Sequence, residues 1–294
     1  NQEIRDDESR LCNVMATPGY PELIGEMVSL NNDRGLTAFI VGDSPFRLAS
    51  DGTTISNWGS NTALAVEDND NGLVTRDEYL GVFYPSLFTS DNAGNNVVVP
   101  PSHGMLRTLA LSDQVSFPWF APAGTRRGGI TNASASGFVD AEGEFKSIAL
   151  NEGQRDTLYS LNINPITFLT GAGLVNFGQK TRAKNASALD RINVARLVIY
   201  LRSQLKKLAK PYIFEPNDKI TRDEIKAQVD SLMLELVSQR ALYDFLVVCD
   251  ESNNTPARID RNELYVDIAI EPVKAVEFIY IPLRLKNTGE IAGL

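Results

Sequence analysis

The hydrophobic pattern is clearest in the last third of the chain, where it predicts two amphipathic helices. Between residues 194 and 208 the apolar positions recur at helical spacing and should share one buried face. These positions are Val194, Leu197, Val198, Leu201, Leu205 and Leu208. Pro211 lacks a backbone N–H and should end this helix. Thr221 and Glu224 form a Thr-x-x-Glu capping box, which predicts the start of a second helix with an apolar face over 225–237.

After the second helix the pattern changes to that of strands. A short apolar run covers 245–249, alternating apolar and polar residues cover 264–270, and a third apolar segment covers 276–285, interrupted at Pro282. Two helices on one face of an antiparallel or mixed sheet form a compact layer.

The first half of the chain mixes short apolar segments with turns. A strand–helix–strand order is expected over 11–41, followed by a polar segment at 51–71. Residues 79–88 are predicted to form one strand, and the Pro100–Pro101 pair should start a short helix. Residues 131–146 are small and polar and are predicted to be an exposed connection.

These elements predict an α/β (α+β) protein with helices packed on mixed or antiparallel sheets. We expect two closely associated lobes, 1–125 and 126–294. The second lobe would contain the two helices and three strands and end in a linking arm at 283–294.

Composition narrows the function further. The chain has 294 residues, of which 43% are hydrophobic and 22% charged, as in ordinary globular proteins. Its net charge of −9 argues against a nucleic-acid binder, and no apolar run approaches the ~20 residues of a membrane helix. Cys12 and Cys249 lie in apolar segments and are expected to be buried free thiols. Because the first residue is Asn1 and not Met, we expect the chain to begin inside a longer protein.

Catalytic sites find little support in the sequence. His103 is the only histidine and follows the Pro100–Pro101 pair, where a turn or surface role is the more common one. A zinc site would need clustered His and Cys residues, and the one histidine and two cysteines of this sequence lie far apart along the chain. Gly171, Gly173 and Gly178 resemble a nucleotide-binding loop, but the third glycine is misplaced and a strand is predicted next, which favours a hairpin turn.

Residues 67–78 offer a calcium-binding alternative. Several polar residues there occupy ligand positions of an EF-hand loop: Glu67, Asn69, Asn71, Gly72 and Glu78. The first position should be Asp, and Arg76 weakens the anionic cage. An acidic, solvated loop is therefore the preferred interpretation.

The first long helix is basic, although the whole chain is acidic. Six basic residues and no acid occur in it: Arg191, Arg196, Arg202, Lys206, Lys207 and Lys210. Arg196, Lys206 and Lys210 should share one face. This face could pair with acids of the second helix, such as Asp223 and Asp230, or dock onto an acidic partner.

Several segments resemble contractile phage tail sheath proteins, over about residues 13–285 and most closely from Pro100 onward. The segments that carry the resemblance are Pro100–Gly104, Ala121–Gly124, Asn162–Asn164, Phe177–Thr181, Ile192–Arg196 and Tyr212–Asn217. The first five correspond to the family patterns PPSG, aPAG, gIN, wGaRT and iNVRR, and the closing segment Tyr212–Asn217 also matches the family. Ala195 departs from the family by replacing the first arginine of the usual pair, as do Gln179 and Lys180, which replace Ala-Arg.

The resemblance implies a structural, non-enzymatic subunit without cofactors. Sheath subunits polymerise helically around a tail tube and contract to drive it through the host envelope during genome ejection. The implied partners are other copies of the chain, the tail tube protein, and baseplate and tail terminator proteins, with no nucleic acid and no membrane insertion. The implied location is the virion of a bacteriophage, with assembly in the host cytoplasm.

The resemblance also implies where subunits meet. Terminal arms in this family add strands to neighbouring subunits, and residues 283–291 alternate apolar and polar positions as such a strand would. Leu283, Leu285 and Ile291 are therefore expected at a subunit interface. The face with Arg196, Lys206 and Lys210 is a candidate to meet the tube or a neighbour.

Overall fold

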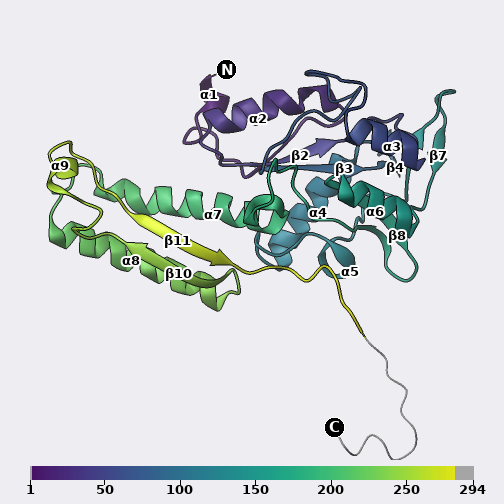
Figure 1. The fold of residues 1–294 in the computed structure, drawn as a ribbon. Helices are drawn as coiled ribbons and strands as arrows, with labels where there is room; N and C mark the ends of the chain where they lie inside the picture. The colour runs from purple at the N-terminus through teal and green to yellow at the C-terminus, as the bar shows by residue number, and fades with distance from the viewer. Residues whose placement is uncertain (1, 282–294) are drawn as a thin grey trace, which may run out of the picture.

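A five-stranded sheet forms the centre of the protein in the computed structural model, which describes residues 2–281 (Figure 1). Its strands, in spatial order, are β1 (Val14–Ala16), β2 (Phe39–Asp43), β3 (Leu80–Tyr84), β8 (Ile163–Leu169) and β9 (Gly173–Asn176). The first four are parallel, and β9 pairs antiparallel with β8. Every residue of β2 and β3 is buried, because helices cover both faces of the parallel strands.

Helices pack on both faces of this sheet. One face is covered by α2 (Ile24–Asp33), α3 (Gly52–Gly59) and α6 (Glu152–Ser160), and the other by α4 (Pro101–Val115) and the first half of α7 (Ile192–Ala209). Successive side chains of β2 point to opposite faces of the sheet. Ile40 therefore packs in the core on the first face, and Phe39 and Val41 pack in the core on the second. The predicted strand–helix–strand unit over 11–41 is confirmed as β1, α2 and β2.

A second, antiparallel sheet lies beside the first. Its order is β5 (Asn96–Val99), β4 (Ser86–Ser90), β6 (Ala135–Val139) and β7 (Phe145–Ser147). The predicted single strand at 79–88 is therefore wrong, because β3 and β4 are separated at Pro85 and belong to different sheets.

The exposed connection predicted at 131–146 is also wrong, since it contains β6 and β7. These strands are specified more by backbone pairing, and by the close approach of the two backbones to each other, than by apolar side chains. A Cβ atom at Gly137 would lie 2.1 Å from the carbonyl oxygen of Lys146, so only glycine fits there. The polar segment 51–71 likewise contains α3, which is capped by Asp51 through the backbone N–H of Thr54 at 2.8 Å.

The C-terminal elements project from the central body, on the left in Figure 1. They are α7, α8 (Lys219–Ser238), β10 (Leu242–Val248) and β11 (Asp267–Pro272), which confirms the predicted order of two helices and two strands. Leu197 and Leu201 of α7 pack with α8 and β10 in a third core. Helix α7 therefore contributes its first half to the sheet core and its second half to the projection.

The third predicted strand is wrong over its described part. Residues 276–281 form no regular strand, and 282–285 lie outside the described residues. An apolar segment becomes a strand only where a sheet edge pairs with it, and this one leaves β11 and runs back to the body without joining a sheet (Figure 1).

The remaining helices are short. The α-helical ones are α1 (Gln2–Arg5), α5 (Gly124–Arg127) and α9 (Pro256–Ile259), and the 3₁₀ turns are η1 (Pro21–Leu23), η2 (Ala188–Asp190) and η3 (Lys210–Tyr212). Strands from both sides of residue 125 share the central sheet, and the division into lobes at that residue stays a prediction. None of the helices in residues 2–281 has the length and apolar character of a membrane span.

The two cysteines differ in their environment. Cys249 is buried directly after β10, and burial raises the pKa of its thiol. Cys12 is exposed just before β1, so the expectation of a buried thiol is wrong at this position. The apolar run that suggested a strand begins two residues later, at Val14.

Helix α8 begins earlier than the predicted capping box. Asp218 is its N-cap, and the Asp218 side chain accepts a hydrogen bond from the backbone N–H of Thr221 at 2.9 Å. The predicted box at Thr221 and Glu224 is therefore wrong, because an Asp–x–x–Thr turn places the cap three residues before it.

We expect Asp218→Ala to lower the melting temperature by about 2–4 °C, because α8 loses its N-terminal acceptor. Thr221→Val keeps the backbone N–H that Asp218 binds and loses only the hydroxyl contact, so it should lower the melting temperature less. Thermal unfolding followed by circular dichroism compares the two variants. Equal losses in both would contradict the assignment of the cap to Asp218.

Candidate functional site

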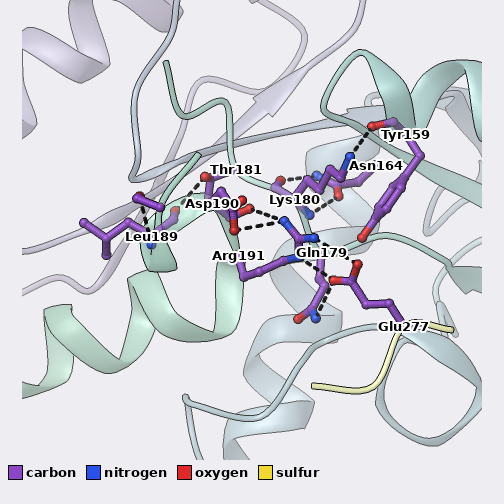
Figure 2. Close-up of polar contacts among 10 residues, drawn as sticks. Tyr159, Asn164, Gln179, Lys180, Thr181, Leu189, Asp190, Arg191 and Glu277 are labelled. Carbon is purple, nitrogen blue, oxygen red and sulfur yellow. Dashed lines mark hydrogen bonds and ion pairs between the residues drawn. The ribbon is translucent and has the colours of Figure 1, made fainter. Parts of the chain in front are cut away.

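The C-terminal segment returns to the body at Glu277, where three side chains converge (Figure 2). Glu277 accepts hydrogen bonds from Arg191 Nε at 2.5 Å, from Arg191 Nη2 at 3.1 Å and from Gln179 Nε2 at 3.1 Å. Tyr159 is the fourth member and also hydrogen bonds to Glu277. We call these four residues the Glu277 cluster. They join α6, the segment before η2, the start of α7 and the C-terminal segment.

The turn that carries Gln179 is fixed by close packing against β8. A Cβ atom at Gly178 would lie 2.8 Å from Asn164 Oδ1, so this approach requires glycine. Asn164 Oδ1 accepts from the backbone N–H of Lys180 at 2.7 Å, and Asn164 Nδ2 donates to the Lys180 carbonyl at 2.8 Å. These contacts hold Gln179 in one position relative to the sheet (Figure 2).

Arg191 is positioned from the other side. It is the N-cap residue of α7 and pairs with Lys180 in an isolated antiparallel bridge. The Thr181 hydroxyl donates to the Leu189 carbonyl at 2.7 Å, which closes the loop between them. Arg191 also forms an ion pair with Asp190 at 2.9 Å, so its guanidinium is held between two carboxylates.

Both members of the central ion pair are charged at neutral pH. Burial opposes ionisation of Glu277, but hydrogen bonds from Arg191 and Tyr159 outweigh it and lower the pKa of Glu277. Burial likewise opposes the charge of Arg191, and the Glu277 carboxylate outweighs it and raises the pKa of Arg191. Because the Arg191 and Glu277 side chains are only 29% and 16% exposed, solvent screens this pair weakly.

Lys180 lies beside the cluster without a carboxylate partner in the described part of the chain. Its ammonium donates to the Tyr159 carbonyl at 2.8 Å and lies 4.1 Å from the centre of the Tyr159 ring. Burial and the nearby Arg191 charge lower the pKa of Lys180. Lys180 therefore orients Tyr159, and the ion pair with Glu277 is formed by Arg191.

Apolar side chains on both sides of Glu277 are exposed. They are Val276, Phe278, Ile279, Tyr280 and Ile281, with 69–88% of their surface accessible. A contiguous exposed apolar run of this kind marks an interaction surface. The Glu277 cluster thus fixes one point of a segment whose apolar side chains are left uncovered by residues 2–281.

The predicted basic face is divided by the structure. Arg196 is buried and forms a bidentate ion pair with Asp113 of α4, at 2.9 and 2.5 Å. The Arg196 charge is therefore neutralised by Asp113 inside the protein and is not presented on the surface. Lys206 and Lys210 are exposed, and whether they meet the tube or a neighbour stays a prediction.

The acids that pair with this face are not those of α8. Lys206 binds Asp7 at 2.8 Å and Lys210 binds Glu8 at 3.3 Å, both from the N-terminal segment. The interpretation that α8 neutralises α7 is therefore wrong, because α8 turns its apolar face toward α7. The other predicted interface residues, Leu283, Leu285 and Ile291, lie outside the described residues.

The nucleotide and calcium alternatives find no support in the geometry. Gly171 and Gly173 form the turn of the β8–β9 hairpin, as predicted, and no helix follows to face a phosphate. Asn69 is buried, and its Oδ1 accepts from the backbone N–H groups of Val74 and Thr75 at 3.0 and 2.9 Å. Among residues 2–281 no group of three His, Cys, Asp or Glu side chains could hold a metal ion.

Comparison with known proteins agrees with the resemblance in the sequence. Residues 184–286 match the family described as phage tail sheath C-terminal domain. The tail sheath protein of Vibrio phage KVP40 is 39% identical over 199 residues, which are 66% of this chain and 28% of that protein. The chain belongs to the tail sheath protein family.

Other sheath proteins extend this comparison. The tail sheath protein of Enterobacteria phage T4 is 34% identical over 200 residues, or 67% of this chain and 29% of that protein. The chain thus spans less than a third of the curated sheath proteins that it matches. The PVC sheath of an extracellular contractile injection system, solved in the contracted state, shares the fold. It aligns with a TM-score of 0.72 and 20% identity over 99% of this chain and 75% of that one.

The sequence prediction does not include the Glu277 cluster as a site. Arg191 and Glu277 are 86 residues apart, and no local pattern links them. One signal does exist in this sheath sequence: Glu277 is the single acid in the apolar stretch 273–281. An isolated carboxylate in such a stretch needs a donor elsewhere in the fold.

Proposed function

We propose that the chain is part of a structural subunit of a contractile tail sheath. The subunit polymerises helically around a tail tube and contracts to drive the tube through the host envelope, without a catalytic step. The observation that carries this proposal is the exposed apolar run around the anchored Glu277. A segment that is fixed at one residue and uncovered on both sides suits contact between subunits.

The proposed contact is strand addition between copies. The β10–β11 sheet has two strands, and no other described strand pairs with its outer edges. A segment from a neighbour that continues through 283–294 would add backbone hydrogen bonds to such an edge and bury Leu283, Leu285 and Ile291. Each buried side chain contributes about 1.5–3 kcal/mol, and association costs about 4–15 kcal/mol. One arm therefore binds weakly, and several arms in a lattice bind strongly.

The remaining partners follow from this role. The subunit would contact other copies of itself, the tail tube protein, and baseplate and tail terminator proteins at the ends of the sheath. It would assemble in the cytoplasm of the bacterial host and become part of the virion. Family membership and the names of the relatives support this role.

Deletion of residues 283–294 from the full-length protein tests the proposal. We expect the deletion to abolish sheath assembly, because the arm that joins neighbours is lost. Electron microscopy of the full-length protein expressed alone would show hollow cylinders for the wild type and dispersed particles for the variant. A matched thermal melt checks that the variant is folded. Normal cylinders after the deletion would refute the linking role.

A further inference from the structure

The turn between α7 and α8 presents an exposed aromatic ring on a strained backbone. Phe214 has φ 78°, a conformation that bulky residues rarely adopt, and its side chain is fully exposed. Ile213 and Ile220 beside it are exposed as well. Within residues 2–281 no side chain covers the Phe214 ring, so no packing of this ring compensates for the backbone strain.

Hydrogen bonds hold this turn in one shape. The backbone N–H of Glu215 donates to the Tyr212 carbonyl at 3.2 Å. Asn217 Nδ2 donates to the Glu263 carbonyl at 2.9 Å, and the buried Arg222 donates to Asn217 Oδ1 at 3.3 Å. The ring is thus preorganised, which lowers the entropy lost when a partner binds it. We call Ile213, Phe214 and Lys207 the α7–α8 tip.

The charge near this tip is positive. Lys206, Lys207 and Lys210 form the end of α7, and no acid occurs between Arg191 and Tyr212. Lys206 and Lys210 are bound by the N-terminal segment. Lys207 is exposed and has no ion-pair partner in the part of the chain that the structure describes. The α7–α8 tip therefore combines the exposed apolar side chains of Ile213 and Phe214 with the exposed ammonium group of Lys207.

A loop on the central body has the opposite character. Leu64 and Val66, in the loop after α3, are each 81% exposed, and Glu67, Asp68 and Asp70 follow them. These three carboxylates form no ion pair with any described residue. Burial, with repulsion from Asp68, raises the pKa of Asp70, and a cation would relieve that repulsion.

This loop is also preorganised. Asn61 Nδ2 donates to the Ala65 carbonyl at 2.8 Å, and the Ala65 N–H donates to Asn61 Oδ1 at 2.9 Å. Leu64 between them has φ 55°. A rigid apolar turn with acidic neighbours is complementary in shape and charge to the rigid apolar tip with its basic neighbour.

We propose that the α7–α8 tip of one copy docks on the 64–70 loop of a second copy. The tip lies at the far left of Figure 1, whereas α3, from which the loop leads, lies on the right. A contact between two different surfaces is heterologous and repeats from copy to copy, so it builds a ring where the rotation closes and a helical filament where it does not. The inference rests on the proposed function, because a self-assembling subunit is what brings the second copy to this tip.

Phe214→Gly separates the folding role of this residue from its binding role. Glycine accepts a positive φ, so the melting temperature should rise, while the critical concentration for assembly of the full-length protein should rise about tenfold or more. Arg240→Gly is a matched control, because Arg240 also has a positive φ (63°) but lies at the C-terminal end of α8. It should raise the melting temperature and leave assembly unchanged.

Charge reversal tests the identity of the partner. Lys207→Glu and Asp70→Lys should each weaken assembly, and the double variant should restore it. A photocrosslinking residue at 214 in the full-length protein should crosslink to 64–70 of a second copy, whether or not cylinders form. Crosslinks elsewhere or none, or cylinders from Phe214→Gly at the wild-type concentration, would overturn the inference. Absence of cylinders from the wild type would instead count against the proposed function.

Discussion

Glu277→Gln is expected to detach the C-terminal segment from the body and to prevent sheath assembly by the full-length protein. The substitution keeps the shape of the side chain but removes the charge that two Arg191 nitrogens bind at 2.5 and 3.1 Å. Charge-assisted hydrogen bonds contribute about 1.5–3 kcal/mol. A loss of about 2 kcal/mol raises the detached fraction about 30-fold. Chymotrypsin cleavage at Phe278 and Tyr280 reports detachment directly, and electron microscopy reports assembly.

Glu271→Gln is the matched control for this prediction. Glu271 lies in β11, six residues before Glu277, and its side chain has no hydrogen-bond or ion-pair partner among the described residues. Its substitution should leave both the cleavage rate and the yield of cylinders unchanged. Equal cleavage rates in the two variants would contradict the anchoring role of Glu277.

Acid should reproduce the effect of Glu277→Gln in the wild type. The folded state lowers the pKa of Glu277, so its contribution to stability is complete above the unfolded pKa of about 4.3 and is lost as the pH falls through the lower folded value. Pepsin, which is active in acid, should therefore cleave the wild type faster relative to the Glu277→Gln variant below about pH 4. The Glu277→Gln variant has already lost this dependence.

The sequence predicted the long elements well because their patterns are long. Six apolar positions at helical spacing specify α7, and a similar face specifies α8. Strands β10 and β11 were predicted as well, from a short apolar run over 245–249 and from alternating apolar and polar residues over 264–270. The segment 276–281 is apolar as well but pairs with no described strand, so pattern alone gave the wrong state.

The short polar elements could not be predicted in the same way. Strands β6 and β7 are only five and three residues long. Strand β6 is held by β4, which lies far away in the sequence, and β7 pairs with β6 alone. Gly137 is required there by the approach of another backbone, a fact that its own sequence neighbours do not contain. The Arg196–Asp113 pair was missed for the same reason: its members are 83 residues apart.

Helix α7 explains why the candidate site and the fold depend on each other. Its N-cap Arg191 binds the C-terminal segment, Arg196 binds α4, and its last turns reach the α7–α8 tip. The helix therefore connects the anchored segment, the sheet core and the far end of the projection. A displacement of the segment at Glu277 would act first on the start of this helix.

Arg182→Met is expected to lower the stability of the whole body. Arg182 is 1% exposed, and its guanidinium donates to the carbonyls of Leu161 at 2.6 Å, Leu73 at 3.2 Å and Thr75 at 3.4 Å. It thus joins the 60–79 loop to the end of α6. Burial lowers its pKa to about 10, so it remains charged at neutral pH. Methionine fills a similar volume but leaves these buried carbonyls without donors.

The expected loss is about 2–4 kcal/mol in the free energy of unfolding, or about 5–10 °C in melting temperature. Arg182→Lys should recover only part of it, because one ammonium cannot reach three carbonyls in the way a planar guanidinium does. Arg76→Met is the control: Arg76 is exposed, adjacent in sequence to Thr75, and has no hydrogen-bond partner among the described residues. If Arg182→Met and Arg76→Met melt at the same temperature, the carbonyl contacts of Arg182 do not stabilise the fold. If only Arg182→Met melts early, the contacts of Arg182 with the carbonyls of Leu161, Leu73 and Thr75 stabilise the fold.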